Sequence, residues 1–311
     1  MVIFLLKRLV VLFLTLICLS FTVFSLVTIE PNLKKLALNQ ANMRMEEDEV
    51  QSWLEKNGYK RPLLVQYGEW LGNAVTGDFG YSTHFRKPVN EVIWPKLGHT
   101  GILMFWVFLL TIPIALTVGV LAGMREGTKT DRSLSIFAIF TTSVPPYVSG
   151  ILFTILFSSW LGILKGVAKA GNITFANFAL PVLTIVAYDI GYIARMTRAS
   201  MVEVMGSQYI RTARLKGMPF MAVVLKHALR NALIAPFTAI MLQFPWLLTG
   251  VVIVEKLFNY KGFGFLLVSA ADQNDIDVTL ACGVVAVVLV LTTQLISDIG
   301  YVFLNPRIRF S

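Results

Sequence analysis

Few residues in this sequence have the types and spacings that a catalytic site requires. The three histidines, His84, His99 and His227, lie far apart, and the topology predicted from the sequence puts the last across a membrane from the other two. The HExxH and GxSxG motifs of zinc and serine hydrolases are absent, and so is the phosphate-binding GxxxxGK[ST] loop. We therefore predict no catalytic site, metal site or cofactor in this chain, and any ATP chemistry would come from a partner.

The most informative residues lie in a hydrophilic segment, 198–236, between two apolar stretches. Ser207 suits the N-cap position of a helix, and the pattern predicts a short helix from Gln208 to Lys216. Gly217 suits the left-handed position that follows a helix, and Pro219 prevents the helix from continuing. The segment therefore predicts a short helix that lies between two turns.

The side chains of this short helix suit contact with another protein. Thr212 and Ala213 are small, so a partner surface can approach closely, and Arg211, Arg214 and Lys216 place positive charge around them. A helix that lies in a groove of its partner is a common mode of recognition. An ordinary basic connector between two membrane helices is the alternative interpretation.

Two carboxylates and a proline pair lie inside apolar stretches. Charges within membrane spans are costly and usually functional. Asp189 lies just over one helical turn before Arg195, so both a structural ion pair and a role in a pathway stay open, and we hypothesise that Asp189 helps to hold an inner gate. Asp298 is expected to reach the membrane interface or to pair with a tail arginine. Pro145 and Pro146 are further candidates for a gate or pathway.

The composition is that of an integral membrane protein. Of the 311 residues, 56% are hydrophobic and only 14% are charged, whereas soluble domains carry about 25% charged residues. The net charge of +9 does not cluster as a nucleic-acid-binding element requires. Cys18 and Cys282 both lie within apolar stretches, which favours simple packing over a disulfide framework.

Six apolar segments are long enough to cross a bilayer, which takes roughly 20 helical residues. They run over residues 9–29, 101–123, 133–164, 173–194, 231–254 and 278–304. The third is longer than one straight span needs, and the proline pair within it predicts a kink or break. The first has an apolar run too long for a secretory signal and no small-x-small cleavage site after it, so we interpret it as a retained signal anchor. The predicted fold class is an all-α membrane protein with six transmembrane helices.

Positive charge lies mainly on one side of this topology. With the N-terminus in the cytoplasm, the cytoplasmic segments carry fourteen basic residues against Glu126, Asp131 and Glu203, while the outer segments carry thirteen residues of each sign. The positive-inside rule therefore places both termini in the cytoplasm. The fourteen basic residues are Lys7, Arg8, Arg125, Lys129, Arg132, Arg195, Arg198, Arg211, Arg214, Lys216, Lys226, Arg230, Arg307 and Arg309.

The one sizeable hydrophilic stretch outside the membrane is 30–98. We predict short helices that pack as a cap on the outer face: the acidic run 46–49 as a solvated helix start, a turn at Asn57-Gly58, and an amphipathic helix over Leu63 to Val75.

The segment from Tyr209 to Gly217, together with His227-Ala-Leu-Arg-Asn-Ala, resembles the coupling loop of permeases in the oligopeptide/dipeptide/nickel class of ABC importers. The general importer motif is Glu-Ala-Ala, three residues, Gly, nine residues, Ile-x-Leu-Pro. Ala213, Gly217 and Leu229 match its spacing. At the remaining motif positions this sequence has Arg211, Thr212, His227 and Arg230, and such departures are usual in the peptide/nickel class.

The resemblance covers most of the chain. It includes Gly77-Asp-Phe-Gly-Tyr-Ser82, Ile193-Ala-Arg-Met-Thr-Arg198, Asn231-Ala and the tail Asn305-Pro-Arg-Ile-Arg309. Three departures lie on the outer side: Glu30-Pro-Asn32 for Pro-Gly-Asp-Pro, Tyr260-Lys-Gly-Phe-Gly264 for Trp-Pro-Gly-Leu-Gly, and Asn274-Asp-Ile-Asp277 for Arg-Asp-Tyr-Pro. They bear on the solute and on the binding-protein contact more than on the mechanism.

The resemblance implies a type I importer permease in a bacterial inner membrane. A second homologous permease would complete the pathway, two cytoplasmic ABC ATPases would bind ATP and Mg, and an extracytoplasmic binding protein would deliver peptides or peptide-like solutes. Residues Tyr209, Arg211, Thr212, Ala213, Arg214 and Gly217 would couple the permease to the ATPases. The implied organisation is a signal anchor, 1–29; a cap, 30–98; a permease core, 99–304, that contains the coupling loop 198–230; and a cytoplasmic tail, 305–311.

Other interpretations stay open. The same machinery could import nickel or metal chelates, or oligosaccharides, and one permease sequence does not distinguish these solutes. A stand-alone secondary transporter would be favoured by inverted repeats and several pathway-facing charges, and neither is clear in this sequence. An intramembrane enzyme is the least favoured interpretation, since the hydrolase motifs are missing.

Overall fold

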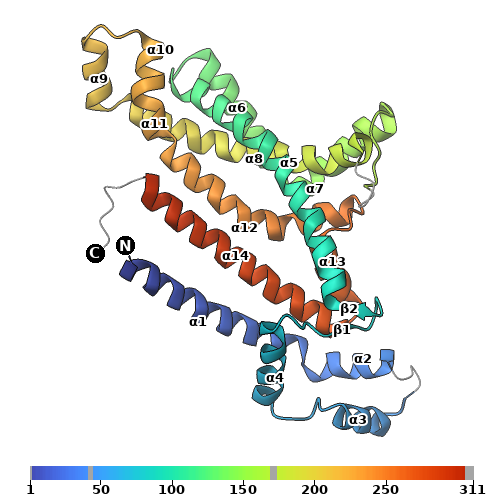
Figure 1. Cartoon of the computed structure of the whole chain (residues 1–311). Helices are drawn as coiled ribbons and strands as arrows, with labels where there is room; N and C mark the ends of the chain where they lie inside the picture. Colours follow the sequence, from blue (N-terminus) through green and yellow to red (C-terminus); the bar gives the residue numbers. More distant parts are fainter. Residues whose placement is uncertain (1, 41–44, 169–173, 305–311) are drawn as a thin grey trace. The chain divides into compact units, whose positions relative to one another are not determined.

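The structure is a computed structural model that describes residues 2–40, 45–168 and 174–304 (Figure 1). These residues are mostly helical, and their two short strands, β1 (Tyr81–Ser82) and β2 (Lys87–Pro88), pair antiparallel with Tyr81 opposite Pro88. The chain forms two compact units: residues 1–100 with 261–292, and residues 101–260 with 293–311. Helices α5 (Val89–Gly123) and α14 (Ile276–Leu304) contribute to both units.

The first unit holds α1 (Val2–Val27) and the predicted short helices, α2 (Glu30–Gln40), α3 (Glu47–Lys56) and α4 (Leu63–Val75). A capping box between Glu46 and Glu49 starts α3, as the acidic run predicts. Gly58 turns the chain after α3 at a φ of +79°. Lys34 pairs with Glu47, and this hydrogen bond lowers the pKa of the Glu47 carboxyl.

A core of aromatic side chains joins the helices of this unit. The ring of Tyr67 packs against Phe21 and Phe24 of α1, and its hydroxyl lies 2.6 Å from the Ser20 hydroxyl. A second apolar cluster is formed by side chains of α13 (Phe263–Asp272), of the start of α14 and of the start of α5, which directly follows β2. The helices of the first unit therefore pack around apolar clusters of their own, and the segment between the first two spans is not a loose loop.

The second unit is built around α8 (Phe175–Met205). Helix α8 packs against α6 (Lys129–Ser143), α7 (Pro146–Phe153) and α12 (Ile234–Leu257). Close approach requires glycine here: a Cβ at Gly191 would lie 2.1 Å from Thr141 Oγ1 of α6, and one at Gly119 of α5 would lie 2.4 Å from Thr197 Cβ. The remaining elements are a π-helical turn, η1 (Thr154–Trp160), and the short segments α9 (Gln208–Leu215), α10 (Phe220–Val223), η2 (Val224–Ala228) and α11 (Leu229–Ala232).

Among the described residues, four helices are long and apolar enough to span a membrane: α1, α5, α8 and α14. Two bent pairs raise that number to six if each is one span: α6 with the segment Pro146–Trp160, and Phe220–Ala232 with Ile234–Leu247. The first pair bends by 97° at Pro145 and Pro146, so the predicted break is confirmed. Helix α8 continues to Met205, well beyond residue 194, where the predicted span ends, because no helix-breaking residue lies between them.

Candidate functional site

Helix α9 matches the short helix that the sequence predicts, with two local differences. It runs from Gln208 to Leu215, with Lys216 as C-cap and Gly217 at a φ of +76°. Gly217 therefore takes the left-handed conformation, which is costly for residues with a Cβ. Ser207 takes the N-cap position, but its side chain makes no capping bond; the hydroxyl instead donates to the Val204 carbonyl at 2.6 Å.

One face of α9 is packed against the chain's own helices. Ile210 and Ala213 are buried in a cluster with Met201 of α8 and with residues of α10 and η2. The Asn231 amide of α11 donates to the Tyr209 hydroxyl at 2.8 Å, which joins two parts of the family motif. The small Ala213 side chain faces inward, so its size lets α9 approach the bundle itself.

The opposite face of α9 is open. Arg211, Thr212, Arg214 and Lys216 are exposed, and the Leu215 side chain is 80% exposed. This face therefore combines basic side chains with one apolar side chain at its C-terminal end. The geometry therefore offers a rigid helix that is anchored on one side and basic with an apolar end on the other.

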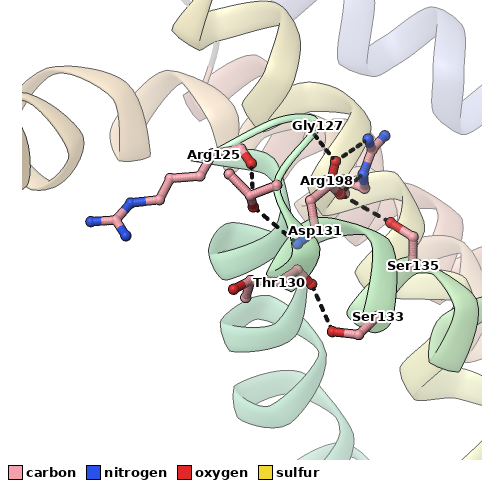
Figure 2. Close-up of polar contacts among 8 residues, drawn as sticks. Arg125, Gly127, Thr130, Asp131, Ser133, Ser135 and Arg198 are labelled. Atoms are coloured by element: carbon pink, nitrogen blue, oxygen red, sulfur yellow. Dashed lines mark hydrogen bonds and ion pairs between the residues drawn. The ribbon is translucent and has the colours of Figure 1, made fainter.

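An ion pair that sequence reasoning missed joins α8 to the start of α6 (Figure 2). Arg198 of α8 donates two hydrogen bonds to Asp131 of α6, Nε to Oδ1 at 2.5 Å and Nη2 to Oδ2 at 2.8 Å. The same carboxylate accepts from the Gly127 backbone amide and from the Ser135 hydroxyl. A bidentate arginine–carboxylate pair fixes both distance and orientation, so α8 is held to the turn that precedes α6.

Further contacts hold the turn that precedes α6 and connect it to α9 and α10. The Thr128 hydroxyl caps α6 by accepting from the Asp131 amide at 3.3 Å. The guanidinium groups of Arg125 and Arg214 each lie near the Phe220 ring, at 5.3 and 5.9 Å from its centroid. These cation–π distances link the turn, α9 and α10 through one aromatic ring. The two basic segments of the second unit, 124–132 and 198–230, therefore form one connected surface.

The gate candidates occupy two different environments. Asp189 of α8 is fully buried, and its Oδ1 accepts from the Gln243 amide of α12 at 2.8 Å, while its Oδ2 has no hydrogen-bond partner among the described residues. The alternative of an ion pair with Arg195 is not found there. Pro145 and Pro146 start α7 directly after the bend, as its N-cap and first residue. The tail arginines proposed for Asp298 lie outside the described residues.

In the first unit, the family motif 77–82 ends in the first strand of the β1–β2 hairpin, and this strand contacts a buried carboxylate. Asp275 is fully buried and accepts from the Ser82 hydroxyl at 2.6 Å and from the His84 amide at 3.2 Å. Asp277 accepts from the Tyr81 amide, and Gly80 has a φ of +85°. The Gly77–Ser82 and 274–277 segments, separated by almost 200 residues in the sequence, are thus one structural feature.

Solved structures with this arrangement of helices are ABC transporter permeases. The match to an amino acid ABC transporter covers 68% of this chain and 92% of the other, with a TM-score of 0.52 and 14% identity. The MetNI methionine ABC transporter, in an inward-facing conformation, also gives a TM-score of 0.52, with 19% identity over 69% of this chain and 95% of its own. About two thirds of the chain therefore shares the fold of these ABC transporter chains.

Sequence comparison identifies the family. Residues 115–310 match the family described as binding-protein-dependent transport system inner membrane component. The chain is 35% identical over 276 residues to the oligopeptide transport system permease protein AppB of Bacillus subtilis (strain 168). This alignment covers 86% of this chain and 87% of the relative. It is 37% identical over 257 residues to the glutathione transport system permease protein GsiC of Escherichia coli O1:K1 / APEC, with 81% and 82% covered. A putative peptide permease protein of Brucella ovis is 31% identical over 305 residues, with 94% and 95% covered.

The chain therefore belongs to the binding-protein-dependent transport system inner membrane components, and it is a permease subunit of an ABC importer. The resemblance drawn from the coupling-loop motif is confirmed.

Proposed function

We propose that this chain forms half of a translocation pathway for peptides or peptide-like solutes. A second, homologous permease forms the other half, two cytoplasmic ABC ATPases bind ATP and Mg, and an extracytoplasmic binding protein delivers the solute. The names of the relatives, which include oligopeptide, peptide and glutathione permeases, support a peptide-like solute over metal chelates and oligosaccharides.

The proposed topology has six spans, with each bent helix pair counted as one, and both termini in the cytoplasm. In this topology the excess of basic residues lies on the side of the membrane that holds the N-terminus, which supports this orientation. It places α9 and the Asp131–Arg198 pair in the cytoplasm, and α2, α3, α4 and the hairpin outside.

The observation that carries this proposal is the two-sided character of α9. Its inner face is fixed by Ile210, by Ala213 and by the Tyr209–Asn231 hydrogen bond. Its outer face presents Arg211 and Leu215. A helix attached in this way moves together with α8 when a partner moves it, which is what the coupling of ATP hydrolysis to a two-state membrane bundle requires.

The coupling role is tested by retention of the ATPases on a tagged chain. We expect Leu215→Asp and Arg211→Glu to reduce the co-purified ATPase at least about tenfold, because a loss of roughly 1.4 kcal/mol of binding free energy is tenfold in affinity. Lys56→Glu, on the exposed end of α3, is the matched control and should retain it. Full ATPase retention and full uptake in both α9 variants would contradict the coupling role.

Two further substitutions test how α9 is held. Gly217→Pro cannot adopt the left-handed backbone, and Ala213→Trp cannot enter the buried cluster. Both should uncouple ATP hydrolysis from uptake while the membrane part stays folded, as judged by size-exclusion chromatography in detergent. Unchanged uptake in both variants would remove Ala213 and Gly217 from the coupling set.

The inner-gate hypothesis for Asp189, Pro145 and Pro146 rests on their positions in the second unit. Asp189→Asn preserves the acceptor for Gln243 but removes the charge. If uptake and ATP hydrolysis both stay unchanged in this variant, the charge of Asp189 has no part in the gate.

A further inference from the structure

A groove runs between the C-terminal part of α8 and the segment formed by α11 and the first half of α12. It has a volume of about 430 Å³ and lies entirely within the second unit. On α8 it extends from Tyr192 to Glu203, a rise of roughly 16 Å in a helix. We call it the α8–α12 groove, and the residues that line it include Met196, Ser200, Glu203, Asn231, Thr238 and Leu242.

The α8–α12 groove has a negative charge at one end and apolar side chains toward the other. Among the described residues that line it, Glu203 is the one with a charge, and it forms no ion pair with another described residue. By contrast, the Asp131 carboxylate is already paired with Arg198. Met196 and Leu242, farther along the groove, are 39% and 57% exposed. The groove therefore suits an occupant that carries both positive charge and apolar side chains.

Helix α14 brings the C-terminal tail of the chain close to this groove. It ends at Leu304, beside the start of α12 (Figure 1). A Cβ at Gly300 would lie 2.7 Å from Phe237 Cζ, so α14 touches α12 at the residue that precedes Thr238 of the groove. The sequence continues over 305–311, a tail of seven residues that lie outside the described residues. Seven extended residues reach at most roughly 23 Å, so this tail is long enough to enter the groove and follow it.

The sequence of the tail carries both kinds of side chain that the groove suits. It reads Asn-Pro-Arg-Ile-Arg-Phe-Ser, so basic and apolar residues alternate over 307–310. Pro306 disfavours a helical conformation at the residue before it, and successive side chains of an extended chain point to opposite sides. One side of an extended tail is therefore basic, with Arg307 and Arg309, and the other is apolar, with Ile308 and Phe310.

We propose that the tail 305–311 docks in the α8–α12 groove of its own chain, with its two arginines beside Glu203 and its apolar side against Met196 and Leu242. The docked tail is a strap that joins α14 to α8, and this docking does not depend on the solute. Helix α9 packs against Met201 of α8, so the strap also restrains the helix that we propose as the coupling element. This second consequence rests on the proposed coupling function.

Disulfide cross-linking within one chain tests the docking. In the full-length chain with Cys18 and Cys282 replaced by alanine, Ser200→Cys in the groove is combined with Ile308→Cys in the tail, and native membranes are oxidised with copper phenanthroline. The control combines Ile308→Cys with Ser133→Cys, an exposed serine near the start of α6. We expect the groove pair to cross-link at least about tenfold faster, because docking raises the effective concentration of one thiol near the other. Equal rates for the two pairs, or a link between two chains instead of within one, would overturn the docking.

Charge reversal tests the pairing of the tail with Glu203. Glu203→Lys should slow the groove cross-link at least about fivefold, because attraction becomes repulsion, and adding Arg307→Glu with Arg309→Glu should restore the rate. The control Glu126→Lys, on the exposed turn before α6, should change the rate less than about twofold. A rate unchanged by Glu203→Lys, or a loss caused by Asp298→Asn instead, would overturn the pairing with Glu203.

ATP hydrolysis by the purified complex tests the restraint separately from the docking. Arg307→Glu with Arg309→Glu should raise hydrolysis in the absence of the binding protein at least about twofold, because releasing the strap shifts the population of the bundle's two states. Adding Glu203→Lys should return hydrolysis to the parent's level. Unchanged hydrolysis in a complex whose groove pair cross-links would overturn the restraint. A chain that cross-links in the groove but recruits no ATPase would contradict the proposed coupling function and leave the docked tail intact.

Discussion

The pair between Asp131 and Arg198 yields the sharpest quantitative prediction, because its two sides differ in exposure. The Asp131 side chain is 5% exposed and that of Arg198 is 31% exposed. Removing Asp131 leaves an arginine that can reach water, whereas removing Arg198 leaves a buried carboxylate without its cation. Breaking a buried pair costs about 3 to 5 kcal/mol, and hydrogen bonds to charged groups contribute about 1.5 to 3 kcal/mol. We therefore expect local losses of about 2 kcal/mol for Asp131→Ala and about 3 kcal/mol for Arg198→Ala.

Hydrogen exchange measured by mass spectrometry over residues 124–135 is the suitable assay. The amide of Gly127 donates to Asp131, and that of Arg132 donates to the Thr128 carbonyl. If the turn opens locally, about 2 kcal/mol raises the exchange rate of these amides about thirtyfold, because roughly 1.4 kcal/mol is a factor of ten. Arg198→Ala should raise it further.

Glu126→Ala provides the control, since Glu126 is exposed on the same turn and its loss should change exchange less than about twofold. Exchange within a factor of two of the parent for Asp131→Ala would refute the claim that this pair holds the turn. A larger effect for Asp131→Ala than for Arg198→Ala would refute the reasoning from burial.

Three further predictions follow from buried contacts. Ser82→Ala removes a donor to Asp275 and leaves the Phe85 amide without its acceptor, so exchange of residues 83–86 should rise about tenfold; an unchanged rate would show that the hairpin does not depend on this contact. Gly191→Val should abolish recovery of folded protein in fluorescence-detected size exclusion, because its side chain would overlap α6; Gly98→Ala, where a Cβ meets nothing within 4 Å, should be recovered normally. Gln243→Leu leaves the buried Asp189 carboxyl without its donor and should lower the melting temperature in detergent, and a melting temperature equal to the parent's would contradict that role.

Local features could be predicted from the sequence because neighbouring residues determine them. Gly217 takes the left-handed conformation because the helix must end before Pro219. The break at Pro145 and Pro146 follows from the missing amide hydrogens of proline. The Ser207 side chain differs from the expectation: its hydroxyl donates to the Val204 carbonyl of the preceding helix, and it accepts no bond from an amide of α9.

Contacts between distant segments could not be predicted in this way. Asp131 and Arg198 are 67 positions apart, and Ser82 and Asp275 are 193 apart. Hydrophobic periodicity does not indicate which polar residues meet when helices pack. The family motifs pointed to these positions, since Arg198 is the last residue of one motif and Ser82 the last of another. Only the packed structure shows that each of these side chains donates a hydrogen bond to a carboxylate.

The direction in which Ala213 points is a further case. Its small size predicts close approach, and this is what the structure has, but the approach is to the chain's own cluster. A single sequence does not distinguish a small residue that faces a partner from one that faces its own bundle. The exposed Leu215 is the residue that sequence reasoning passed over on α9.

The composition of the purified complex tests the central claim most directly. The chain is tagged at one terminus, purified from its native membrane in mild detergent, and analysed by mass spectrometry together with an ATPase assay. Our account predicts recovery of a second, similar permease and one or two kinds of ABC ATPase, with hydrolysis stimulated by an extracytoplasmic binding protein. Recovery of this chain alone, as a stable homo-oligomer that transports without ATP, would contradict the account and favour a secondary transporter.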